Sequence, residues 1–148
     1  MTTALNNLQS AFRLIRAERE RQIIQEGYTV HSDKVNGHED LVLAAATYEM
    51  EQKDRGENLH SWPWDISLWK PTAHEGAAGR IRELEKAGAL YMAAKAVMEA
   101  KGLVIPLKQA VCQKVDLMAE RIAELLGAAD GGADCFVPRN DGEEVGHV

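Results

Sequence analysis

The sequence of 148 residues is poor in cysteine, and the two cysteines that it has lie far apart. Cys112 and Cys135 form neither a closely spaced metal-binding pattern nor a disulfide framework. Proteins that depend on disulfides for stability contain more cysteine than this and belong to oxidising compartments. The cysteine content therefore excludes a disulfide-stabilised scaffold and a zinc finger, and we expect a cytoplasmic protein.

Long hydrophobic runs and an excess of basic charge are also missing. No stretch approaches the roughly 18 apolar residues of a membrane-spanning helix, and the first residues lack the charged start and apolar block of an export signal. Lys and Arg number 17 against 23 Asp and Glu, which gives a formal net charge of -6. We therefore expect neither a membrane nor a nucleic-acid duplex as a partner.

What the sequence does contain is a helical pattern, because apolar residues recur three or four positions apart in four segments. These segments are residues 3–25, residues 41–53, residues 77–101, and a fourth that begins near Pro106 and ends near Gly127. No alternation typical of a strand is long enough to count. The sequence predicts an all-α fold, a bundle of about four helices with a long Trp-rich insert between helices two and three.

The pattern ends after Gly127, where the remaining residues include five acidic side chains and one basic side chain, Arg139. Such a segment is typical of a solvated terminus. We therefore expect a single helical domain over residues 1–127 and a flexible acidic tail over residues 128–148.

The third and fourth helices carry patterns that favour close helix packing. Small residues surround Gly88 in the third helix, which suits a central position in a bundle or a dimer interface. The fourth helix has a heptad-like apolar stripe, formed by Val111, Val115, Met118, Ile122 and Leu125. Because so much apolar surface must be covered, we expect a homodimer or a higher homo-oligomer.

The turn between helices one and two is the richest polar region. His31, Asp33, His38, Glu39 and Asp40 fall within ten residues, and imidazole with carboxylate suits zinc, manganese or iron. The alternative is a solvated loop whose acidic residues stand at the start of helix two, where the helix dipole favours them. Both interpretations stay open from the sequence.

Helix one presents a second polar set, since Glu18, Arg21, Gln22 and Glu26 share one face. If that face points inward, Glu18 and Glu26 could join the carboxylates of helix two in a magnesium site, which is the usual way to hold a triphosphate. If it points outward, the same residues form a salt-bridged surface worth a few tenths of a kcal/mol per pair.

The Trp-rich insert, SWPWDISLWKP, is the third candidate region. Trp62, Trp64 and Trp69 could stack on a nucleobase while Lys70 meets a phosphate. Equally, the three rings could cover a core that the slender third helix leaves under-filled. Tyr28, Tyr48 and Tyr91 carry the same ambiguity, and we include Tyr28 with Arg21 among the candidate ligand-binding residues.

Four segments together resemble a group of small phage and prophage proteins of no assigned activity. The segments read AERERQIIQEGYTVHSD, DLVLAAATYE, WPWDISLWKP and RIRELEKAGALYMAAK, in the order in which that group carries them. The resemblance covers about residues 17 to 100. It implies a phage-type protein, located in the cytoplasm of the host cell.

The chain is also distantly similar to the MazG-like all-α nucleotide pyrophosphohydrolases, which share the opening motif of helix one. This resemblance implies magnesium-dependent cleavage of a nucleoside triphosphate to monophosphate and pyrophosphate. It implies that Glu18 and Glu26 of the first helix, and Glu39 or Asp40 of the second, are metal ligands.

These patterns lead to one expected function and two alternatives. The expected function is binding of a nucleotide or a nucleotide signal, as a sequestering or host-modulating module. The first alternative is a magnesium-dependent pyrophosphohydrolase of the MazG-like type. The second alternative is a modulator that binds a host protein.

Overall fold

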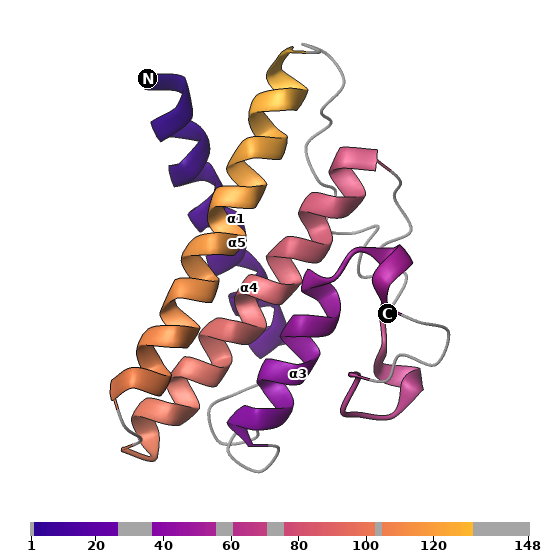
Figure 1. The fold of residues 1–148 in the computed structure, drawn as a ribbon, viewed down its shortest axis with the longest axis vertical. Helices are drawn as coiled ribbons and strands as arrows, with labels where there is room; N and C mark the ends of the chain where they lie inside the picture. Colours follow the sequence, from indigo (N-terminus) through magenta and orange to yellow (C-terminus); the bar gives the residue numbers. More distant parts are fainter. Residues whose placement is uncertain (1, 27–36, 56–60, 71–75, 103–104, 132–148) are drawn as a thin grey trace.

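The protein is an all-α bundle, as the sequence predicts (Figure 1). The computed structural model describes residues 2–26, 37–55, 61–70, 76–102 and 105–131. Its four α-helices are α1 (Thr2–Glu26), α3 (His38–Glu49), α4 (Gly76–Ala100) and α5 (Ile105–Gly131), and two single-turn 3-10 helices, η1 (Gln52–Asp54) and η2 (Ile66–Leu68), follow α3. The described residues contain no strand.

Two helix boundaries differ from the prediction. Helix α3 ends at Glu49, four residues early, because Met50 adopts an extended conformation and its N–H bonds the carbonyl of Ala46. Helix α5 continues to Gly131, so residues 128–131, which we assigned to the acidic tail, are helical. The pair of alanines after Gly127 explains this extension, since alanine is the strongest helix former. Residues 132–148 lie outside the described part of the chain.

Helix α4 is the centre of the bundle and packs against α1, α3 and α5. Ala87, Ala93 and Ala94 are fully buried, which lets neighbouring helices approach closely. One close approach is to α1, where a Cβ added to Gly88 would lie 2.9 Å from Cδ1 of Ile15. The predicted central position is therefore confirmed, and it is reached within one chain, which removes one reason to expect a dimer.

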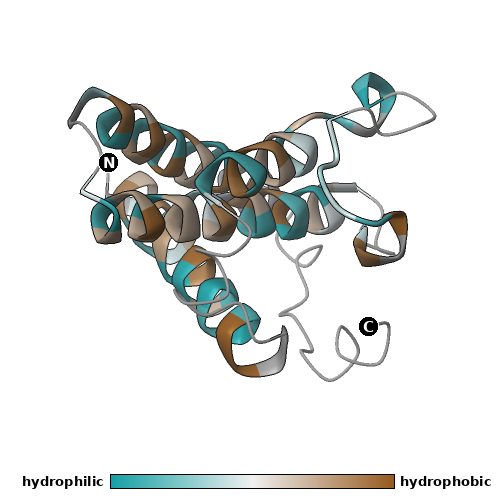
Figure 2. Cartoon of the chain, turned by 90° about the horizontal axis from the view of Figure 1, so that it is seen from below, coloured by the Kyte–Doolittle hydropathy of each residue, from teal (hydrophilic) through white to brown (hydrophobic). Residues whose placement is uncertain are grey.

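The apolar stripe of α5 faces the core. Val111, Met118 and Ile122 are buried, and Val115 and Leu125 are partly buried against the same cluster. Hydrophilic and hydrophobic residues alternate along the helices in Figure 2. Helix α4 differs from an amphipathic surface helix because it is buried on every side between Ile81 and Tyr91. Among the helices described here, none is long and apolar enough to cross a membrane.

Candidate functional site

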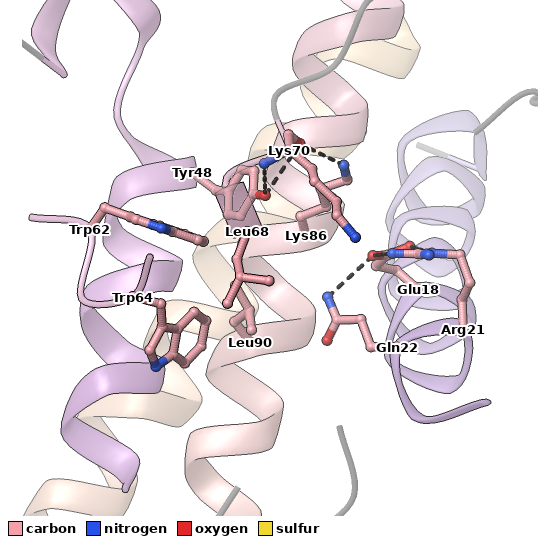
Figure 3. Close-up of a pocket in the computed structure, with 10 residues that line it drawn as sticks. All are labelled: Glu18, Arg21, Gln22, Tyr48, Trp62, Trp64, Leu68, Lys70, Lys86 and Leu90. Atoms are coloured by element: carbon pink, nitrogen blue, oxygen red, sulfur yellow. Dashed lines mark hydrogen bonds and ion pairs between the residues drawn. The ribbon is translucent and has the colours of Figure 1, made fainter. Parts of the chain in front are cut away.

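A small hollow opens over α4, between α1 on one side and the end of α3 with residues 61–70 on the other (Figure 3). The hollow has a volume of about 20 Å³, which is room for one water molecule, and the empty space around it, including open solvent, is about 320 Å³. The lining residues are Glu18, Arg21, Gln22, Tyr48, Trp62, Trp64, Leu68, Lys70, Lys86 and Leu90.

The hollow brings together residues that the sequence placed in two separate candidate sets. Arg21 comes from the polar face of helix one, and Trp62, Trp64 and Lys70 come from the Trp-rich insert. Glu18, which we considered as a metal ligand, lies beside them. The polar face of helix one therefore points inward at this point of the structure.

One wall of the hollow is aromatic. The ring centroid of Trp62 lies 5.7 Å from that of Tyr48 and 5.4 Å from that of Trp64, and both pairs are edge-to-face. Trp69 does not line the hollow, because it stacks on Tyr48 at 4.5 Å and lies 5.1 Å from the guanidinium of Arg55. All three tryptophans are partly buried against the core cluster, so each covers the core, and Trp62 and Trp64 also line the hollow. Stacking on a nucleobase stays a prediction.

Tyr48 fixes the aromatic segment to α3. Its hydroxyl donates to the carbonyl of Lys70 and accepts from the N–H of Lys70, both at 3.2 Å. At the other end of the segment, the hydroxyls of Thr47 and Ser61 are 2.7 Å apart. The indole N–H of Trp62 donates to the carbonyl of Asp65 at 3.1 Å. These bonds hold residues 61–70 across the end of α3.

The wall of the hollow opposite the aromatic one is polar and is formed by Glu18, Arg21 and Gln22 of α1. Glu18 is almost fully buried. Its carboxylate accepts hydrogen bonds from Arg21 at 2.8 and 2.9 Å, from Gln22 at 3.1 Å, and from Arg82 of α4 at 2.5 Å. Burial by itself would raise the pKa of Glu18, but the bonds from Arg21 and the charge of Arg82 outweigh it and lower the pKa. Glu18 is therefore ionised at neutral pH.

Basic side chains outnumber acidic ones around the hollow. Among the described lining residues, Arg21, Lys70 and Lys86 carry positive charge and Glu18 alone carries negative charge. The ammonium of Lys86 donates to the carbonyl of Lys70 at 2.8 Å and lies 5.6 Å from the ring of Tyr48. The side chain of Lys70 extends toward Glu18 in Figure 3. The local charge favours an anion although the whole chain is acidic.

A second buried ionic network lies on the α3 side of α4. Arg55 donates to both carboxylate oxygens of Glu83 at 2.9 and 3.1 Å, and to the carbonyls of Thr47 and Tyr48 at 2.8 and 3.1 Å. Arg80 also bonds Glu83, at 3.3 Å, and donates to three carbonyls at the end of α3. This network satisfies the carbonyls that the end of a helix leaves without partners.

A third polar contact joins α3 to α5 along an open groove of about 660 Å³. Glu49, the last residue of α3, accepts from the hydroxyl of Tyr91 at 2.7 Å, from Lys114 at 3.1 and 3.2 Å, and contacts Arg121 at 3.5 Å. Burial, together with the bond to Glu49 and its negative charge, raises the pKa of Tyr91.

The candidate metal ligands are spread over different parts of the chain. His31, Asp33 and the candidate Tyr28 lie outside the described residues. Glu26 is the last residue of α1, and the position of its side chain is not described. The described residues contain no group of three His, Cys, Asp or Glu side chains arranged to hold a metal ion.

The remaining candidates, His38, Glu39 and Asp40, form the first turn of α3. Acidic residues at this position interact favourably with the helix dipole, which is the structural role that we gave as the alternative. Glu18 is the one candidate metal ligand that lines the hollow, and its carboxylate is bonded to two arginines rather than grouped with other carboxylates.

Three residues of the site were not singled out from the sequence. Arg82 and Glu85 lie on the helix that we expected to be slender, and both are buried, with Nη1 of Arg82 at 3.2 Å from Oε1 of Glu85. Lys86 lines the hollow beside them. The available signal was the run RIRELEK, in which charges recur on every face of the helix, so that some of them must point inward.

Comparison with known proteins gave no match to a family model, to a curated protein or to a solved structure.

Proposed function

We propose that the protein is a binding module for a nucleotide or a nucleotide-like molecule, and that the ligand binds in the hollow between α1 and residues 61–70. The observation that carries this proposal is the meeting of an aromatic wall with an excess of basic side chains. Nucleotides combine an aromatic base with an anionic phosphate. The base would match the aromatic wall, and the phosphate would match the basic side chains.

In this proposal the aromatic contact comes from Trp62 and Trp64, which lie edge-to-face and line the hollow. Stacking of a base on an aromatic side chain contributes about 1–3 kcal/mol per base. The hollow accepts only a group the size of one water, so in this proposal the ring of the ligand lies outside it and one substituent enters.

The anionic contact comes from Arg21 and Lys70. Arg21 is partly buried and held in place by its two bonds to Glu18, so little side-chain entropy is lost when it meets a phosphate. The backbone N–H and carbonyl of Lys70 are both bonded to the hydroxyl of Tyr48, which fixes the point from which the side chain of Lys70 extends.

We favour binding over hydrolysis because of the donor set. Magnesium needs carboxylates free to coordinate it, whereas the carboxylate of Glu18 already accepts bonds from two guanidinium groups. A metal there would have to displace Arg21 or Arg82. The proposed module therefore retains its ligand unchanged, which suits sequestration of a nucleotide signal.

The test is equilibrium binding, followed by the fluorescence of the tryptophans and by calorimetry, with nucleoside mono- and triphosphates and cyclic nucleotides. The variant Lys70→Met removes the ammonium and keeps both backbone bonds to Tyr48. We expect it to weaken binding by about tenfold or more. The matched control is Lys53→Met, which alters an ammonium on an exposed side chain that does not line the hollow.

Chromatography of the same mixtures separates the alternatives. A nucleotide recovered intact from the protein supports the proposal, and conversion of a triphosphate to a monophosphate would replace binding by hydrolysis. Absence of any nucleotide binding would overturn the proposal and favour a protein partner.

A further inference from the structure

Gln22 has a buried hydrogen-bond acceptor that the rest of the structure does not use. The residue is 3% exposed, and its amide nitrogen donates to Oε2 of Glu18 at 3.1 Å. Its Oε1 is buried and has no hydrogen-bond partner among the described residues. Buried polar atoms are almost always paired in folded proteins, so an unpaired one needs a reason.

The orientation of this amide is fixed by its neighbour. A carboxylate accepts hydrogen bonds and does not donate them when it is ionised, and the pKa of Glu18 is lowered. The NH2 group of Gln22 must therefore face Glu18, and a flipped amide would set two acceptors against each other. As a result Oε1 points away from Glu18, as Figure 3 shows.

Gln22 lines the hollow, and the enclosed space there takes one group the size of a water molecule. The group that pairs with Oε1 must be a donor. A cationic donor is disfavoured, because Arg21, Lys70 and Lys86 line the same hollow. A neutral N–H group about the size of a water molecule can donate to Oε1 and adds no positive charge beside the three basic side chains.

We infer that Gln22 is the specificity-determining residue of the hollow, and that its Oε1 accepts a hydrogen bond from a neutral amino group on the aromatic ring of the ligand. The exocyclic amines of adenine and cytosine have this chemistry. The inference rests on the proposed nucleotide-binding function and deepens it: Arg21 and Lys70 meet the phosphate, and Gln22 selects the base.

The test compares ligands that differ by the amine alone. AMP and purine riboside 5′-monophosphate form one pair, and CMP and the 5′-monophosphate of 2-pyrimidinone riboside form the other. For the unaltered protein we expect AMP or CMP to bind about tenfold more tightly than its partner without the amine, which corresponds to about 1.4 kcal/mol. This comparison needs no variant and therefore no assumption about folding.

The variant Gln22→Met removes the acceptor and keeps the length of the side chain. We expect it to bind both members of a pair with equal affinity, near that of the amine-free ligand. Gln9→Met is the matched control, since Gln9 is an exposed glutamine of the same helix. The control should keep the tenfold preference, and circular dichroism checks that both variants are helical.

The outcomes separate this inference from the proposed function. Equal binding of AMP and purine riboside 5′-monophosphate, and of the cytosine pair, would overturn the role of Gln22 while nucleotide binding stands. A preference that survives in Gln22→Met would also overturn it. If none of the four ligands binds while another nucleotide of the panel does, the inference fails and the proposed function stands. If no nucleotide binds, both fail.

Discussion

Two of the buried carboxylates, those of Glu83 and Glu18, meet arginines on different sides of α4, and their surroundings differ. Around Glu83, Arg55 and Arg80 direct their remaining donors to carbonyls at the end of α3. Around Glu18, the network borders a hollow, and the acceptor of Gln22 has no partner in the described part of the chain. An arginine–glutamate network therefore satisfies the carbonyls at a helix end around Glu83, whereas around Glu18 it leaves an acceptor that a ligand could pair with.

This difference separates a structural role from a binding role in physical terms. A network in which every group is bonded adds stability and has nothing to offer a ligand. A network that contains a buried polar atom without a hydrogen-bond partner is less stable when no ligand is bound, because that atom has lost its bond to water. A ligand that donates to the atom restores the hydrogen bond. The following substitutions test whether the two networks differ in this way.

The largest effect is expected for Arg55→Met. The substitution leaves Glu83 with Arg80 alone and removes the donor to the carbonyls of Thr47 and Tyr48, so we expect a loss of about 3–5 kcal/mol in the free energy of unfolding. Urea denaturation measures it, with Lys53→Met as the exposed control. A loss below about 1 kcal/mol would show that this network is not structural.

The next effect is expected for Glu18→Gln, at about 2–3 kcal/mol near neutral pH, because bonds to a charged acceptor are replaced by weaker ones. The pKa of Glu18 is lowered in the folded protein, so its contribution is complete above the ordinary value of 4.5 and is lost as the pH falls through the folded value. Urea denaturation below pH 4.5 should therefore show a smaller acid-induced loss in the variant. Equal losses in both proteins would contradict the pairing with arginine.

Tyr91→Phe tests the third contact, on the α5 side, and we expect a loss of about 1–2 kcal/mol from removal of the bond to Glu49. The pKa of Tyr91 is raised above its ordinary value of 10.0, so the folded state favours the protonated phenol. That contribution is present below pH 10 and is lost as the pH rises above it. The variant should lose less stability between pH 9 and pH 11, and a steeper loss in the variant would refute the assignment.

The smallest effect is expected for Lys95→Gln. Lys95 and Glu99 form an exposed pair at 4.0 Å within α4, and such pairs contribute less than about 0.5 kcal/mol. Thermal unfolding of the variant should coincide with that of the unaltered protein. A loss as large as the one expected for Glu18→Gln would mean that exposed charges on α4 contribute as much as buried ones. Burial would then not explain the effects of the Glu83 and Glu18 networks.

The helices could be predicted from the sequence because their signals are local. The stripe of Val111, Met118 and Ile122 depends only on a repeat along one segment, and the structure buries it as expected. The end of α3 could not be predicted, since no Gly or Pro marks it. It depends on Arg55 and Arg80, which reach the terminal carbonyls from later in the chain.

The candidate site could be predicted in part. Arg21, Trp62, Trp64 and Lys70 belong to conspicuous segments, and the structure places all four around one hollow. The stacking of Trp69 on Tyr48, away from the hollow, could not be predicted. Three neighbouring tryptophans in an irregular segment give no sign of which ring stacks on Tyr48.

Arg82 was missed for a different reason, which is that charged residues on a helix are usually exposed. Its burial becomes visible only when Glu18, 64 positions earlier in the chain, is placed beside it. The unpaired acceptor of Gln22 is likewise a property of the packed structure.

The two hydrogen bonds between the hydroxyl of Tyr48 and the backbone of Lys70 have a consequence for hydrogen exchange. The amide hydrogen of Lys70 is held by the hydroxyl of one tyrosine, so it can exchange with deuterium only when residues 61–70 separate from α3. The exchange rate of this single amide, compared between the unaltered protein and Tyr48→Phe, therefore measures how often the aromatic wall opens in the unbound protein. A wall that opens often admits a ring larger than the enclosed space, and the frequency of opening then limits the rate at which a ligand can enter.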